Sequence, residues 1–259
     1  MATEDACAKL PPASSNYSPE GSWDTVAHLN TYVTGPSNPT RAIVFIYDIF
    51  GLAPQTLQGA DRLANSINGL VIVPDFFKGV YAQPNWTPPD TEEKKAAFAK
   101  FRSEQAGIPQ NVGKLIEFRK EAGEKWSSVG EEGWGVFGLC WGGKLGILVS
   151  GAGNEGRGRK FAASGTAHPS RLDVQDAEAL SVPYLCLASP GEPAEIVAQY
   201  KEVLSKPGKV GVVETYDSMF HGWMGARAKL DDEKNRAEYE RGYNQTAEFF
   251  RQHLSSQRP

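Results

Sequence analysis

Cysteine is scarce in this sequence, which excludes a small scaffold held together by disulfides. Its three cysteines, Cys7, Cys140 and Cys186, are spread over 259 residues and form no C-x-x-C pair. A chain with so few cysteines suits a reducing compartment. Met1 to Cys7 carries acidic residues and has no apolar core of a secretory signal. We therefore expect a cytoplasmic protein.

Long apolar runs and an excess of basic charge are also absent. No hydrophobic stretch approaches the length of a membrane span. The formal net charge of −4 gives no electrostatic reason to expect nucleic acid or an anionic membrane surface as a partner. The hydrophobic content of 40% is enough to bury a sizeable core. These features favour a globular protein that acts on a small molecule, as a monomer or homodimer.

Short continuous apolar runs alternate with segments of helical spacing along most of the chain. Residues 41–47, 70–74, 134–137, 161–165, 182–188 and 210–216 have the length and composition of buried strands. Helical segments are expected at 56–66, 108–126, 144–150, 195–205 and 231–253, and one more begins at Asp90 and includes Lys94, Lys95 and Lys100. This order predicts a single α/β domain with a mostly parallel, doubly wound sheet over residues 23–259.

Three regions outside this pattern carry expectations of their own. Residues 1–22, rich in Pro, Ser and Ala, predict an extended arm or a poorly ordered tail. Residues 24–33 indicate one early strand that contains His28. Residues 80–91 are either a lid over the sheet or a simple connector, and residues 151–158 indicate a glycine-rich turn.

The most informative motif is Gly138-Leu-Cys-Trp-Gly-Gly143, between a predicted strand and a predicted helix. This is the setting of the nucleophile elbow G-x-S-x-G, with Cys140 in place of serine. Glycines two residues either side remove Cβ atoms that would clash in so tight a turn. The alternative is a buried cysteine in a phosphate-binding turn, but neither glycine-rich phosphate motif fits the spacing. A helix N-terminus also favours a thiolate.

A cysteine nucleophile needs a base, and the base needs an acid to orient it. Of the four histidines, His221 follows the last predicted strand, where an α/β-hydrolase keeps its base. Glu192 follows the preceding strand and gives the chain order nucleophile, acid, base. Asp217 and Asp173 are rival acids. The N–H groups of Trp141 and Ile49 are expected to form the oxyanion hole.

Taken together, these motifs resemble the dienelactone hydrolase family. The resemblance covers residue 24 to the C-terminus and is carried by Asp48-Ile-Phe-Gly51, Pro74-Asp75, the Cys140 elbow, Pro-Gly-Glu192 and Phe220-His-Gly-Trp223. It implies an α/β-hydrolase fold, a Cys–His–Asp triad that opens an enol-lactone, with Glu192 here at the aspartate position, and no metal or cofactor. The N-terminal arm and the sequence Tyr47-Asp-Ile-Phe-Gly51 resemble fungal members of the family more than bacterial ones.

The resemblance also suggests which residues surround the substrate. Asp48 stands where bacterial members have a glutamate that contacts the nucleophile, and Phe50 lies in the same loop. Arg227 matches one of two arginines that hold a substrate carboxylate. His168 follows a predicted strand on the same edge of the sheet. Trp223 belongs to a set of aromatic residues expected to line the pocket, with Phe76, Phe77 and Trp86.

The sequence therefore predicts a hydrolase that opens a small lactone, enol-lactone or activated ester through a thioester on Cys140. One alternative is a relative without catalytic activity that binds a small hydrophobic ligand. Another is a thiol-redox protein using Cys140, for which the sequence shows no C-x-x-C motif and no resolving cysteine nearby.

Overall fold

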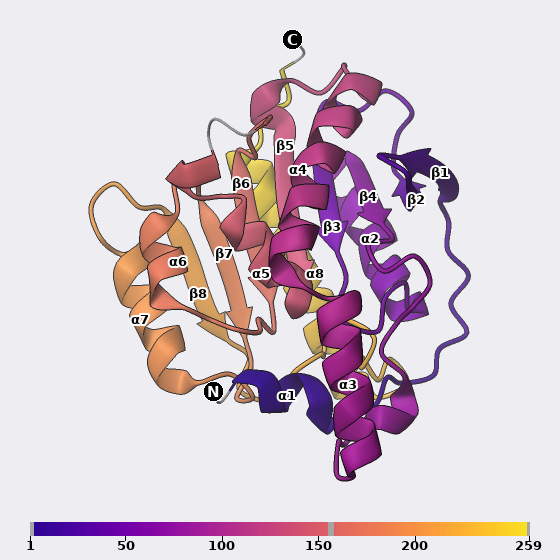
Figure 1. The fold of residues 1–259 in the computed structure, drawn as a ribbon. Coiled ribbons are helices and arrows are strands. Elements are labelled where there is room, and N and C mark those ends of the chain that lie inside the picture. Colours follow the sequence, from indigo (N-terminus) through magenta and orange to yellow (C-terminus); the bar gives the residue numbers. More distant parts are fainter. Residues whose placement is uncertain (1–2, 155–157, 258–259) are drawn as a thin grey trace.

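An eight-stranded sheet runs through the centre of the protein in the order β1-β2-β4-β3-β5-β6-β7-β8. The structure, a computed structural model, describes residues 3–154 and 158–257. The pairs β1–β2 and β2–β4 are antiparallel, and all other neighbours are parallel. The predicted α/β fold with a mostly parallel sheet is confirmed (Figure 1).

The strands are β1 Ser22–Val26, β2 Leu29–Thr34, β3 Ala42–Ile46, β4 Leu70–Pro74, β5 Trp134–Leu139, β6 Ala163–Ala167, β7 Tyr184–Ala188 and β8 Gly211–Thr215. The α-helices are α1 Thr3–Lys9, α2 Pro54–Ile67, α3 Glu92–Glu104, α4 Ile108–Lys125, α5 Trp141–Leu148, α6 Val174–Ala179, α7 Ala194–Leu204 and α8 Glu233–His253. Short 3-10 turns span Pro84–Trp86, Glu131–Gly133 and Ala152–Asn154.

Helices cover both faces of the sheet, which is why its central strands are apolar throughout. Every residue of β3, β4, β5, β6 and β7 is buried. Helices α4 and α5 cover one face, and α8 lies on the other, packed against α2 (Figure 1). That contact is close because Gly59 of α2 lies directly against the Tyr243 ring of α8. Strands buried on both faces read as continuous hydrophobic runs.

The N-terminal part of the chain differs from the prediction. The single strand expected over residues 24–33 is a hairpin, β1 and β2, joined at Ala27 and His28. Both turn residues have positive φ, 48° and 60°, a conformation that their residue types do not signal. The arm expected to be extended contains helix α1, and α6 was also not predicted.

The two remaining loop predictions have different outcomes. In residues 80–91, Trp86 packs edge-on against Phe98 and near Phe101 of α3, with ring centroids 5.6 and 6.2 Å away. The loop therefore lies against α3. Part of the glycine-rich turn predicted over 151–158 lies outside the described residues. Among the helices of the described part of the chain, none is long and apolar enough to cross a membrane.

Candidate active site

Cys140 lies in a sharp turn between β5 and α5, as the elbow motif predicts. Its φ is 51° and its ψ −109°, a strained conformation for a residue with a side chain. A Cβ on Gly138 would lie 2.2 Å from the Gly142 carbonyl carbon, and one on Gly142 would lie 2.4 Å from the Ile46 oxygen. The glycines are required because backbone atoms fill the space around the turn.

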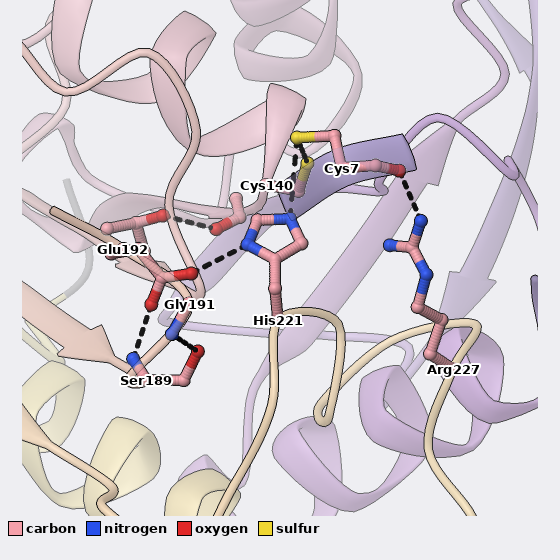
Figure 2. Close-up of polar contacts among 9 residues, drawn as sticks. Cys7, Cys140, Ser189, Gly191, Glu192, His221 and Arg227 are labelled. Carbon is pink, nitrogen blue, oxygen red and sulfur yellow. Dashed lines mark hydrogen bonds and ion pairs between the residues drawn. The ribbon is translucent and has the colours of Figure 1, made fainter. Parts of the chain in front are cut away.

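His221 and Glu192 meet at the same edge of the sheet, although they come from different loops. The Glu192 Oε1 lies 2.6 Å from His221 Nδ1, and both side chains are buried (Figure 2). The second Glu192 oxygen accepts a hydrogen bond from the Ser189 N–H. Of the rival acids, Asp217 is exposed and Asp173 caps α6 by accepting from the Gln175 N–H. The geometry therefore favours Glu192 as the partner of His221.

A third group occupies the space between Cys140 and His221. The Cys7 Sγ of α1 lies 3.0 Å from the Cys140 Sγ and 3.4 Å from the His221 Nε2 (Figure 2). One atom from each of Cys7, Cys140 and His221 lies within 4.8 Å of the other two. Sequence reasoning missed Cys7 because it lies 133 positions from Cys140 in a segment with no strong pattern. The expectation that no second cysteine lies near Cys140 is wrong, because Cys7 is distant in sequence but adjacent in the structure.

The pKa values of the two thiols in this cluster are shifted in opposite directions. A hydrogen bond from Cys140 and the charge of His221 lower the pKa of Cys7 well below its ordinary value. Burial and the neighbouring Cys7 sulfur raise the pKa of Cys140, against the effect expected from the helix N-terminus. Burial lowers the pKa of His221, but Cys7 and Glu192 outweigh it and raise that pKa to about 9. These shifts favour the charged form of both Cys7 and His221 and the neutral thiol of Cys140.

The two groups expected to form the oxyanion hole lie beside the elbow. Trp141 is the first residue of α5, so its N–H has no acceptor within the helix. Ile49 accepts a hydrogen bond from the Ala82 N–H at 3.0 Å, which fixes the peptide group that follows it. Buried Asp48 accepts from the N–H groups of Phe50, at 2.9 Å, and Ala226, at 3.3 Å. Asp48 thereby ties this early loop to the segment after His221.

The other predicted substrate contacts have different surroundings. His168 is fully buried, with its ring centroid 5.2 Å from that of His221, and burial holds its pKa well below the usual range. Neither of its ring nitrogens has a hydrogen-bond partner among the described residues. Trp223 is buried in the core, where it stacks on Tyr216 at 4.4 Å. The structure thus brings the ring of His168 close to that of His221, whereas Trp223 packs in the core.

Arg227 binds the N-terminal segment. Its Nη2 donates to the carbonyl of Cys7, and its Nε donates to the carbonyl of Leu10 at 2.5 Å. The guanidinium also lies over the Phe50 ring, 4.6 Å from its centroid. The residue predicted to hold a substrate carboxylate therefore holds α1 over the site.

A pocket with about 430 Å³ of empty space, part of it open to solvent, leads from α3 to Cys7. Its lining comes from the loop after β3, from α3 and the residues that follow it, from the elbow and from the loop after β6: Ile49, Phe98, Phe101, Arg102, Ala106, Trp141, Ser170 and Arg171. Both residues of the expected oxyanion hole are among them. The pocket reaches Cys7 but not Cys140, and Arg102 and Arg171 in its wall were not predicted.

The cluster of Cys7, Cys140 and His221 also has the ligand types of a soft-metal site. Two thiolates bound to a tetrahedral zinc ion, with Zn–S distances of about 2.3 Å, lie about 3.8 Å apart. The two sulfurs here are 3.0 Å apart. Their spacing favours a direct sulfur–sulfur interaction over a chelate.

The chain is similar in sequence and in fold to known proteins. A fission yeast protein from Schizosaccharomyces pombe, described as an uncharacterized AIM2 family protein, is 33% identical over 244 residues, which cover 93% of this chain and 95% of the relative. The crystal structure of a Klebsiella pneumoniae protein, described provisionally as a dienelactone hydrolase, matches with a TM-score of 0.63 and 16% identity, covering 86% of this chain and 93% of that one.

A second solved structure, a dienelactone hydrolase-like promiscuous phosphotriesterase from metagenomic libraries, matches with a TM-score of 0.62 at 14% identity, covering 91% of this chain and 98% of that chain. At such identities the two structures show a shared fold. The family model describing the dienelactone hydrolase family matches residues 29–254, from β2 to the end of α8. Over nearly its whole length, this chain belongs to the dienelactone hydrolase family, whose members are hydrolases of the ester type.

Proposed function

We propose that the protein hydrolyses a small lactone, enol-lactone or activated ester through a thioester on Cys140. The observation that carries this proposal is the His221–Glu192 pair, 2.6 Å apart, beside a cysteine in a nucleophile elbow. An imidazole held on Nδ1 by a carboxylate presents Nε2 to the nucleophile, which is the arrangement that acid–base assistance requires.

Catalysis in this scheme begins when α1 leaves the site and the Cys140 sulfur becomes the neighbour of His221 Nε2. His221 Nε2 takes the proton of the Cys140 thiol, the resulting thiolate attacks the carbonyl carbon, and the N–H groups of Trp141 and Ile49 stabilise the oxyanion. The tetrahedral intermediate expels the alcohol or enol, which takes a proton from His221. His221, oriented by Glu192, then removes a proton from water, and hydroxide attack on the thioester releases the acid and regenerates Cys140.

The chemistry of the nucleophile narrows the substrate class. A thiolate is a better leaving group than an alkoxide or an amide anion, so the intermediate returns to substrate unless the other group leaves readily. Enols and phenols meet this condition and amines do not. The pocket wall of Phe98, Phe101 and Trp141 suits a small, largely apolar acyl group.

The test is hydrolysis of a p-nitrophenyl ester and an enol-lactone by reduced protein. We expect Cys140→Ala to abolish turnover, and mass spectrometry of the wild type to find an acyl group on the peptide that contains Cys140. Cys186→Ala is the matched control, because Cys186 is a buried cysteine of β7. A Cys7→Ala background distinguishes acylation of Cys140 from acylation of Cys7. Turnover by Cys140→Ala equal to that of the wild type would overturn the proposal.

A further inference from the structure

Helix α1 closes the candidate active site. Its residues Ala6, Cys7 and Ala8 are buried although they lie close to the chain terminus. The helix lies across the edge of the sheet at which the parallel strands end, next to α3 (Figure 1). With α1 in place, Cys140 has no exposed surface. An acyl substrate therefore cannot reach the nucleophile until α1 moves.

Several contacts along the segment hold α1 in this position. Arg227 donates to the carbonyls of Cys7 and Leu10. Further along, the Ala13 N–H donates to the Ala226 carbonyl, and Gln55 Nε2 donates to the Ala13 carbonyl, each at 2.8 Å. These are backbone contacts on the segment, so they fix its path without depending on its side chains. Cys7 is thereby held at one place, directly over Cys140.

The two sulfurs are nearly close enough to bond. Their separation of 3.0 Å exceeds the length of a disulfide bond, about 2.05 Å, by about 1 Å. Cys7 also faces the pocket that leads to solvent, whereas Cys140 is enclosed. A small oxidant entering this pocket meets Cys7 first and finds a second thiol in contact behind it.

We propose that Cys7 and Cys140 form a reversible disulfide that fastens α1 over the active site and switches the hydrolase off. The regulatory part rests on the proposed function, because it takes Cys140 as the nucleophile. The oxidant is a hydroperoxide, and the reductant that reopens the site is a dithiol. Cys7 and Cys140 are thus sites of oxidative modification, and the disulfide between them holds α1 in its closed position.

The oxidation of the two thiols needs hydrogen peroxide as its only added reactant. The Cys7 thiolate attacks one oxygen of hydrogen peroxide, the O–O bond breaks, and the departing hydroxide takes the proton of the His221 imidazolium to become water. The Cys140 sulfur then attacks the sulfenic sulfur of Cys7. The S–S bond forms, the S–O bond breaks, and the hydroxide leaves with the Cys140 proton as a second water. Two thiols have lost two electrons and one peroxide has become two waters.

The test treats reduced full-length protein with one equivalent of hydrogen peroxide in the presence of a chelator, which removes any bound metal. We expect non-reducing peptide mass spectrometry to find the Cys7 and Cys140 peptides joined. Hydrolysis of a p-nitrophenyl ester should fall in proportion to the joined fraction and return with dithiothreitol. Cys7→Ser should give no joined peptide, and Cys186→Ser should behave like the wild type.

The two proposals fail in different ways in this experiment. If the reduced protein hydrolyses the ester but peroxide joins no peptides, or joins Cys7 only to Cys186, the disulfide inference is wrong. If the peptides join but the reduced protein has no hydrolase activity, the proposed function is wrong, and with it the regulatory role. Cys7→Val is a second variant in case serine perturbs the docking of α1.

Discussion

The Cys7 sulfur lies 3.4 Å from His221 Nε2, in the place where the nucleophile of a triad would be the hydrogen-bond partner of the base. Cys140 in turn lies 3.0 Å behind Cys7. Together with Glu192 on Nδ1, this makes a chain of four groups in which the first helix supplies the link between nucleophile and base. The structure therefore represents a closed form, and its consequences can be measured.

Removing α1 should increase hydrolysis. A variant lacking residues 1–10 loses Cys7 and the carbonyl contacts to Arg227, so the site no longer has to open before substrate binds. We expect kcat/KM for a p-nitrophenyl ester to rise by about tenfold for each 1.4 kcal/mol by which docking favours the closed form. Cys7→Ser, which keeps the helix, should give a smaller increase. A truncated protein no more active than the full chain would contradict an occluding role for α1.

The docking of α1 should weaken at both acidic and alkaline pH. The lowered pKa of Cys7 contributes stability that is present above its ordinary value, about 8.5, and is lost as pH falls through the lowered value. The raised pKa of His221 contributes stability that is present below its ordinary value, about 6.5, and is lost as pH rises through about 9. Docking is therefore tightest near neutral to mildly alkaline pH.

Limited proteolysis measures this dependence. We expect cleavage of the N-terminal segment of the wild type to become faster above pH 9. Cleavage should also become faster in acid, relative to Cys7→Ser at the same pH, so that the pH response of the protease cancels. A constant ratio between the two proteins across this range would show that the Cys7–His221 pair does not hold the helix.

Replacing Glu192 should impair the base more than it impairs the fold. Glu192→Gln removes the charge that raises the pKa of His221, so the alkaline limb of the rate profile should move to lower pH. We expect kcat/KM to fall by about 10²–10⁴-fold, the usual range for acid–base assistance. Glu192→Asp keeps the charge one methylene farther away and should retain more activity. Equal rates for the Gln and Asp variants would mean that the charge is not used.

The elbow glycines should be indispensable for stability, in contrast to a glycine on an open helix face. Gly142→Ala places a Cβ 2.4 Å from the Ile46 carbonyl oxygen, a backbone atom that cannot move aside. We expect the free energy of unfolding to fall by more than about 3 kcal/mol. Gly113→Ala, in the middle of α4 with no atom within 4 Å of the added Cβ, should raise it by about 0.5–1 kcal/mol. Urea denaturation compares the two, and similar midpoints would contradict the argument.

The local features of the fold could be predicted because they depend on short stretches of sequence. Continuous apolar runs identify β3, β4, β5 and β7, since a strand covered by helices on both faces has no polar side. The glycines around Cys140 predict the elbow, since few other sequences allow so tight a turn. The Ala27–His28 turn carries no such signal, so the sequence predicts one strand where the structure has a hairpin.

The sequence by itself determined the alternation of strands and helices from β3 onward except for α6, the elbow turn, and the choice of Glu192 and His221 as the proposed acid and base. Only the tertiary structure decided what fills the space above the Cys140 sulfur. Cys7 and Cys140 are 133 positions apart, and contact between them depends on the path of a segment held by Arg227 from the other end of the chain. Periodicity and motifs report on residues that are near one another in the sequence. The contact between Cys7 and Cys140 depends on Arg227 binding backbone carbonyls of the N-terminal segment, so neither signal predicts it.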